Sequence, residues 1–116
     1  MHIVRAGEGR IIDGQGSTLK VLLEPGASPV RSALMGIVEV GAGVRLPAEE
    51  DRFSSHDCEE LSYVISGSLR VWVEGHEVVL GPGDAMLTQP GERHWVKNEG
   101  DEPAVALFVL APPIRL

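Results

Sequence analysis

Two histidines and one glutamate have the types and the spacing of a metal-binding set. His56 precedes Glu60 by four residues, and His94 follows 38 residues after His56. His56 and Glu60 have the same parity, so along a continuous strand both side chains would point to one face. Two imidazoles and a carboxylate form the facial triad of non-haem Fe(II) sites, and they also suit Mn, Ni or Zn. We therefore predict one divalent-metal site made of His56, Glu60 and His94.

The rest of the chain predicts the strands that must bring these residues together. Turn-forming sequences such as Asp13-Gly14, Gly81-Pro82-Gly83 and Glu99-Gly100 recur at short intervals, with short runs rich in Val, Ile and Leu between them. This pattern is typical of an all-β sandwich or barrel. Fourteen glycines and eight prolines leave no window for a convincing helix. The expected strands are Leu19–Leu23, Ala33–Val40, Leu61–Ser66, Leu69–Glu74, Glu77–Leu80, Ala85–Gln89, His94–Lys97 and Ala104–Leu110.

The segment after Glu60 favours a strand over a helix. A helix would also bring residues four apart onto one face, but Tyr63-Val64-Ile65 followed by Ser66-Gly67 is typical of a strand that enters a hairpin. Because His94 is distant in the sequence, only a closed or sandwiched sheet can place it beside His56 and Glu60. The predicted metal site therefore requires the predicted all-β fold.

The segment around Glu60 resembles the first sequence motif of the cupin family. That motif contains His-x-His, a glutamate after three or four residues, and a glycine after six more. His56 takes the place of the second histidine, and Gly67 takes the place of the glycine. Ser54 stands where the first histidine would be, which leaves three protein ligands for a metal. A serine hydroxyl is a weak neutral ligand, so we expect no metal bond from Ser54.

The segment around His94 resembles the second motif of the family. That motif runs glycine, five residues, Pro-x-Gly, two residues, histidine, three residues, asparagine. Gly83, Gly91, His94 and Asn98 fall on its positions, and Gln89 stands where the proline belongs. At the last position we expect Asn98 to fix a strand end rather than to contact a substrate.

The resemblance to cupins implies both a fold and a range of functions. The fold is an all-β double-stranded β-helix, the cupin or jelly-roll barrel, with residues 1–116 as a single domain. The implied activity is that of a metal-dependent enzyme of the dioxygenase, isomerase or cyclase type, acting on a small oxygenated molecule. The alternative is a binding or sensor cupin without turnover, including a metal-free one in which His56 and Glu60 form a hydrogen-bonded pair.

Composition and charge restrict the partners. Seventeen acidic residues against ten basic ones give a net charge of −7 without any Lys/Arg cluster, so we expect neither nucleic acid nor membrane as a partner. No apolar run approaches the roughly 20 residues that span a bilayer, and the first residues do not form an export signal. The single cysteine, Cys58, fits a reducing compartment. We expect a cytoplasmic protein with a small-molecule ligand.

Two tryptophans and the end of the sequence predict self-association. Trp72 and Trp95 have the parity of outward-facing residues, and the apolar segment Pro112–Leu116 could lie against a partner. Edge strands of a small sandwich also need cover. We therefore expect a homodimer.

The remaining expectations concern single residues near the predicted site. Tyr63 has the opposite parity to Glu60, so its side chain is expected to point away from the metal. Cys58 is expected to be neither a ligand nor a redox group, as is usual for a lone loop cysteine. The segment 27–51 is expected to supply the other wall of the pocket, with Met35, Arg45 and nearby Phe53 as residues that define substrate shape.

Overall fold

The computed structural model describes residues 1–116, which form ten β-strands and no helix. The strands are β1 (Arg10–Asp13), β2 (Ser17–Leu23), β3 (Leu34–Val40), β4 (Arg45–Leu46), β5 (Glu59–Ser66), β6 (Leu69–Val73), β7 (His76–Leu80), β8 (Ala85–Thr88), β9 (His94–Lys97) and β10 (Ala104–Ala111). No helix of the length and apolar character needed to cross a membrane is present.

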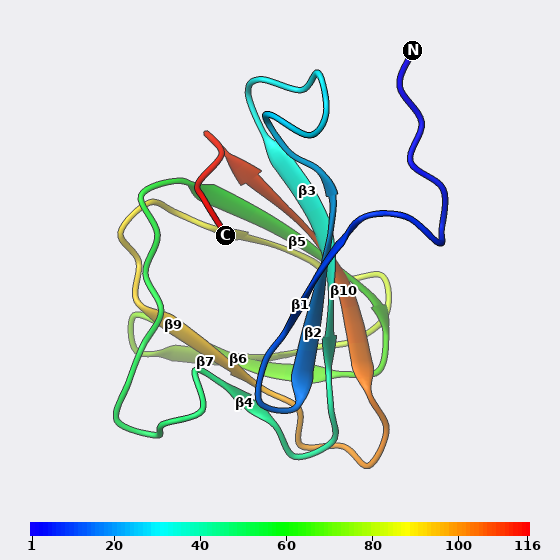
Figure 1. The fold of residues 1–116 in the computed structure, drawn as a ribbon. Helices are drawn as coiled ribbons and strands as arrows, with labels where there is room; N and C mark the ends of the chain where they lie inside the picture. Colours follow the sequence, from blue (N-terminus) through cyan, green and yellow to red (C-terminus); the bar gives the residue numbers. More distant parts are fainter.

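The strands form two antiparallel sheets that face each other across the interior of a barrel (Figure 1). One sheet has the order β1-β2-β3-β10-β5-β8, and the other has the order β4-β9-β6-β7. Strands that are distant in the sequence are neighbours, such as β3 with β10 and β6 with β9. This connectivity is that of a jelly-roll barrel. The predicted all-β double-stranded β-helix is confirmed.

The predicted strands are all present, with ends that differ by at most two residues. Strands β1 and β4 were not predicted, because β1 lies at an exposed sheet edge and β4 has only two residues. Strand β6 ends at Val73 and not at Glu74, because Glu74 has a φ of 45° and Gly75 a φ of 89°. Two successive positive φ values make the tight turn that joins β6 to β7.

Strand β10 shows how the barrel buries one face of a strand. Its even-numbered residues from Ala104 to Leu110 are buried, and the residues between them are half-buried on the outer face. The inward Phe108 packs against Gly36 of β3, where a Cβ atom would lie 2.6 Å from the Phe108 ring. Glycine at position 36 therefore leaves the space that this aromatic ring occupies.

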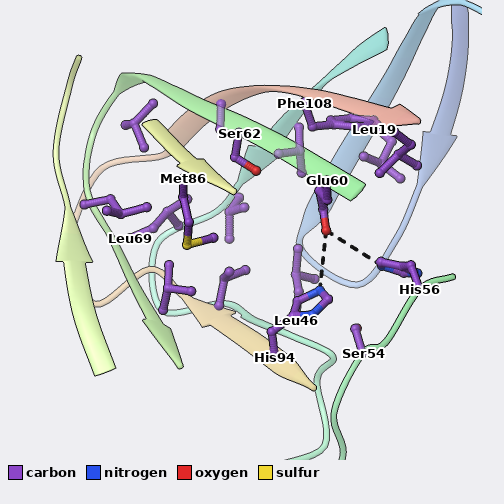
Figure 2. Close-up of a pocket in the computed structure, with 18 of the residues that line it drawn as sticks. Leu19, Leu46, Ser54, His56, Glu60, Ser62, Leu69, Met86, His94 and Phe108 are labelled. Atoms are coloured by element: carbon purple, nitrogen blue, oxygen red, sulfur yellow. Dashed lines mark ion pairs between the residues drawn. The ribbon is translucent and has the colours of Figure 1, made fainter. Parts of the chain in front are cut away.

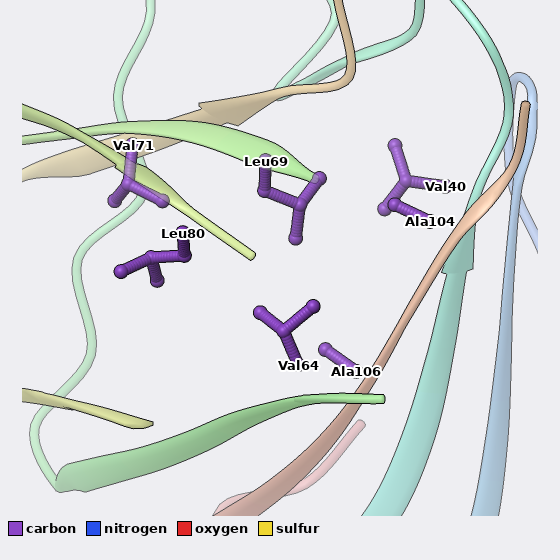
Figure 3. Close-up of a cluster of buried hydrophobic side chains, with 7 residues drawn as sticks. All are labelled: Val40, Val64, Leu69, Val71, Leu80, Ala104 and Ala106. Atoms are coloured by element: carbon purple, nitrogen blue, oxygen red, sulfur yellow. The ribbon is translucent and has the colours of Figure 1, made fainter. Parts of the chain in front are cut away.

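Two clusters of buried apolar side chains form the core. The first cluster joins the two sheets (Figure 3), and it consists of Val40, Val64, Leu69, Val71, Leu80, Ala104 and Ala106. The second cluster consists of Val21, Leu34, Cys58, Phe108 and Leu110. The first cluster is made largely of short side chains, and most of them also line a cavity between the sheets.

A buried asparagine closes the end of β9. The Nδ2 atom of Asn98 donates to the carbonyl oxygens of Val40 at 3.0 Å and Glu102 at 2.7 Å, and its Oδ1 accepts from the Gly100 N–H at 2.9 Å. The residue is 1% exposed, so these bonds take the place of water. As expected, Asn98 fixes a strand end and does not line the cavity.

Candidate metal centre

The three residues predicted as metal ligands come together inside the barrel (Figure 2). Their ligand atoms all lie within 4.8 Å of one another. The Nε2 atom of His94 lies 3.6 Å from Oε2 of Glu60, and the Nε2 atom of His56 lies 4.0 Å from the same oxygen. Two imidazole nitrogens and one carboxylate oxygen therefore face a common centre.

Each of these residues comes from a different part of the fold. Glu60 lies on β5 in the six-stranded sheet, and His94 begins β9 in the four-stranded sheet. His56 lies in the loop before β5, because the chain bends at Asp57 and Cys58 and the strand begins only at Glu59. The assumption that His56 and Glu60 share one continuous strand was therefore wrong, although their side chains do meet.

Main-chain hydrogen bonds join the two segments that carry the ligands. The Ser54 N–H donates to the His94 carbonyl at 2.8 Å, and the His94 N–H donates back to the Ser54 carbonyl at 2.9 Å. The Gly91 N–H donates to the His56 carbonyl at 2.8 Å. The loop that carries His56 is thereby fixed to β9, and Ser54 contributes its backbone to this link.

A further hydrogen bond determines which nitrogen of His94 faces the centre. Its Nδ1 lies 3.1 Å from the carbonyl oxygen of Glu92. A carbonyl oxygen can only accept, so Nδ1 must carry the proton and donate it. In the form of the ring that binds a metal, the Nε2 atom then presents a lone pair toward Glu60. Metal-binding histidines commonly have this arrangement, in which a backbone carbonyl orients the ring.

The candidate ligands lie in the wall of a cavity of about 260 Å³ between the two sheets. Five of the nineteen residues that line it are polar: Ser54, His56, Glu60, Ser62 and His94. The other fourteen are apolar: Leu19, Val38, Val40, Leu46, Val64, Leu69, Val71, Leu80, Met86, Val96, Ala106, Phe108, Leu110 and Leu116. An apolar chamber with a few convergent polar groups is the usual form of a small-molecule site.

The residues expected to define substrate shape do not line this cavity. Met35, Arg45 and Phe53 are all absent from its walls, so that expectation was wrong. Phe53 packs against Trp72 instead, with ring centroids 4.8 Å apart. The Arg45 guanidinium lies 5.1 Å from the Trp95 ring centroid. It also donates to the main-chain carbonyls of Pro47, Glu49, Glu50 and Arg52. Arg45 therefore shapes the loop before the site.

Ser62 and Met86 are among the lining residues that the sequence reasoning missed. Ser62 follows Glu60 by two positions on β5, and Met86 is its cross-strand partner on β8. The parity of Ser62 with Glu60 was a usable signal, because residues two apart on a strand share a face. The place of Met86 depends on the pairing of β5 with β8, which no local pattern gives.

Cys58 and Tyr63 lie outside the candidate metal centre. Cys58 is 2% exposed within the second apolar cluster. Burial raises the pKa of its thiol, with smaller contributions from the charges of Glu60 and Asp57. A neutral buried thiol is a poor ligand and a poor nucleophile. Tyr63 is 47% exposed on the outer face of β5, which agrees with its parity.

Comparison with known sequences places this chain in a family. A sequence model described as the cupin domain matches residues 42–110, which include both motif segments and more than half of the chain. The chain therefore belongs to the cupin family.

Relatives and structural neighbours are similar over most of this chain. It is 33% identical over 98 residues to the tetracenomycin polyketide synthase protein TcmJ of Streptomyces glaucescens, covering 84% of this chain and 63% of that protein. It is 31% identical over 98 residues to the polyketide synthase CurC of Streptomyces cyaneus, covering 84% of this chain and 61% of that protein. The chain thus spans less than two thirds of these two relatives. The polyketide cyclase RemF of Streptomyces resistomycificus has the same fold, with a TM-score of 0.77 and 21% identity over 99% of this chain and 84% of that one.

Proposed function

We propose that this chain is a metal-dependent cupin enzyme in which His56, Glu60 and His94 hold one divalent ion. The observation that carries this proposal is the convergence of their ligand atoms within 4.8 Å at the wall of an apolar cavity. The donor set suits Fe, Mn, Ni or Zn. The orientation of His94 supports the proposal, because its Nε2 lone pair is presented by the hydrogen bond from Nδ1 to the Glu92 carbonyl.

A divalent ion held by His56, Glu60 and His94 would supply Lewis-acid polarisation of a substrate carbonyl. The residues of the chain supply the rest of the environment. The carboxylate of Glu60 balances positive charge, and the two imidazoles add none when neutral. Apolar side chains such as Leu46 and Phe108 keep water away from the substrate. Three protein ligands also leave positions for a substrate oxygen.

The reaction that we propose is ring closure of a polyketide-type chain. In this reaction the carbon of an enolised CH2 group bonds to a carbonyl carbon. The bond from that carbonyl carbon to its oxygen breaks, and the oxygen leaves as one water molecule with the two hydrogens of the former CH2 group. Two relatives with more than 30% identity carry the names of polyketide synthases, which supports this substrate class. The cavity supports it as well, since apolar walls can hold a flexible chain in a compact form in which its reacting carbons are close.

A cyclisation assay with matched variants tests this proposal. The substrate is a synthetic poly-β-carbonyl thioester, and mass spectrometry follows the loss of one water. The metal-loaded parent should close the ring faster than buffer, and Glu60→Gln and His94→Ala should fall to the buffer rate. The controls are Asp57→Asn and His76→Ala, which alter an exposed carboxylate and an exposed imidazole outside the cavity. Equal rates for the parent and His94→Ala would contradict the proposal. Binding without consumption would favour the alternative of a sensor cupin.

We also propose that the protein acts as a homodimer, through a different surface from the one that the tryptophans predicted. Trp72 and Trp95 are half-buried against Phe53 and Arg45. The outer face of β5 and β8 exposes a group of large apolar side chains: Leu61, Tyr63, Ile65 and Leu87. In a chain with a net charge of −7, an apolar patch of this kind is where two copies meet with least repulsion.

Light scattering tests the homodimer proposal. The parent should have the mass of two chains, and Leu61→Lys should reduce it to one chain. Val79→Lys is the control, because Val79 is 57% exposed on the other sheet. A monomeric parent at high micromolar concentration would contradict the proposal.

A further inference from the structure

Ser62 places a hydroxyl in the cavity, further along the barrel wall than the candidate metal ligands. It follows Glu60 by two residues on β5, so both side chains point inward. Figure 2 shows Ser62 and Glu60 on the same wall, with His56 and His94 on the side of Glu60 away from Ser62. The only other hydroxyl that lines the cavity belongs to Ser54, which is linked to His94 through the backbone. Ser62 is therefore the one polar side chain that faces the cavity outside the metal-binding cluster.

The surroundings of Ser62 supply it with no protein partner. Its cross-strand neighbours are Met86 on β8 and Phe108 on β10. Neither side chain carries a strong hydrogen-bond donor or acceptor. A hydroxyl in an apolar wall loses free energy unless a hydrogen bond replaces its water. An oxygen atom of a bound ligand would supply that bond.

Thr88 has the second unusual hydroxyl of this region, but it is not among the residues that line the cavity. It lies opposite Glu60 in the pairing of β5 with β8, and its Oγ1 is buried without a hydrogen-bond partner. Because Thr88 does not line the cavity, a ligand bound in the cavity would not reach the Thr88 hydroxyl. Ser62 is therefore the hydroxyl that a ligand can contact.

The spacing along β5 sets the separation of two polar contacts. The Cα atoms of residues two apart on a strand lie about 7 Å apart, so Ser62 is offset from Glu60 by about that length along the cavity wall. The apolar wall between them offers no other donor or acceptor. A ligand that uses both ends needs two oxygen substituents separated by the width of about two fused rings.

We propose that Ser62 is a specificity-determining residue that selects ligands with two oxygen substituents on one apolar body. One oxygen lies at the centre formed by His56, Glu60 and His94, and the other exchanges a hydrogen bond with Ser62 Oγ. The proposal rests on the proposed function for the first contact, whereas the second contact depends on Ser62 alone. The ligand class is a dioxygenated bicyclic aromatic, or a polycarbonyl chain folded to the same size.

Calorimetric binding of two naphthols tests the proposal. The probes are naphthalene-2,7-diol and 2-naphthol, which differ only in the second hydroxyl. The parent should bind the diol about two- to tenfold more tightly than 2-naphthol, which is the effect of one net hydrogen bond on a dissociation constant. Ser62→Ala should bind both compounds equally and should keep the parent affinity for 2-naphthol. The control is Ser66→Ala, the same change at an exposed position of the same strand, and it should keep the preference for the diol.

The same titrations on zinc-loaded and metal-free protein separate this proposal from the proposed function. If the chain binds no zinc, the metal proposal fails, but a preference for the diol that depends on Ser62 still supports the Ser62 proposal. If zinc binds and Ser62→Ala keeps the preference for the diol, the Ser62 proposal is overturned and the metal proposal stands. A parent that shows no preference, or that binds neither naphthol, also overturns it.

Discussion

Filling the cavity should stabilise this protein, whereas filling its packed core should not. Ala106 is buried on the inward face of β10, and it lines the cavity between the sheets. Replacing it with leucine adds three carbon atoms that can extend into open space. In a close-packed interior the same change forces neighbours apart and costs about 1–3 kcal/mol. The sign of the change in the free energy of unfolding in Ala106→Leu therefore shows whether position 106 borders an open cavity or a close-packed core.

The size of the effect can be estimated from the burial of these atoms. Three buried carbon groups contribute about 2.4 kcal/mol at about 0.8 kcal/mol each, and the loss of leucine rotamers opposes this by about 0.5–1 kcal/mol. The net gain is about 1.5 kcal/mol in the free energy of unfolding. For a chain of this length, that gain corresponds to an increase in Tm of roughly 6 °C.

Ala104→Leu is the matched control for this prediction. Ala104 is 0% exposed on the same face of the same strand, but it does not line the cavity. Its leucine variant should lose about 1–3 kcal/mol, a decrease in Tm of roughly 4–12 °C. Thermal unfolding followed by circular dichroism measures both variants. Ala106→Leu should also weaken the binding of 2-naphthol and leave metal binding unchanged. Equal destabilisation by the two leucines would refute the reasoning.

Three further predictions concern single side chains. Asn98→Ala removes three side-chain hydrogen bonds, so urea unfolding should show a loss of about 3 kcal/mol at about 1 kcal/mol each. Because burial raises the pKa of Cys58, the neutral folded thiol should resist a disulfide reagent at pH 8 and react once the chain is unfolded. As the pH rises past about 8.5, the unfolded thiol ionises first, so stability should fall there and not at lower pH. Ser54→His should tighten zinc binding, since position 54 lines the cavity beside His94, and unchanged affinity would show that this residue does not reach the ion.

The candidate metal centre could be predicted because backbone constraints fix certain glycines at set distances from its residues, and these glycines are visible in the sequence. Gly67 shows such a constraint. It has a φ of 74°, and a Cβ atom there would lie 2.8 Å from the backbone of Ala104, so few other residues are tolerated. The fixed distance from Glu60 to this glycine identified the motif, and the motif identified His56 and His94 as its companions.

Other features depended on strand pairing that no local pattern contains. The two-residue strand β4 exists only because Arg45 and Leu46 pair with β9. The hydrogen bonds from Arg45 to the following loop likewise arise from the folded path of the chain and not from a residue pattern. Met86 faces the cavity because β8 pairs with β5 in one register. The outer apolar face was missed because the exposed apolar residues of β5 and β8 become neighbours only in the sheet.

Metal content tests the central claim most directly. Untagged protein is equilibrated with zinc, dialysed against metal-free buffer and analysed by inductively coupled plasma mass spectrometry, beside a variant that carries both His56→Ala and His94→Ala. We predict about one zinc per chain for the parent, and the same for the control His76→Ala, whose histidine is exposed on β7. The double variant should retain none. A parent that holds no more zinc than the double variant would contradict the claim that His56, Glu60 and His94 form a metal site.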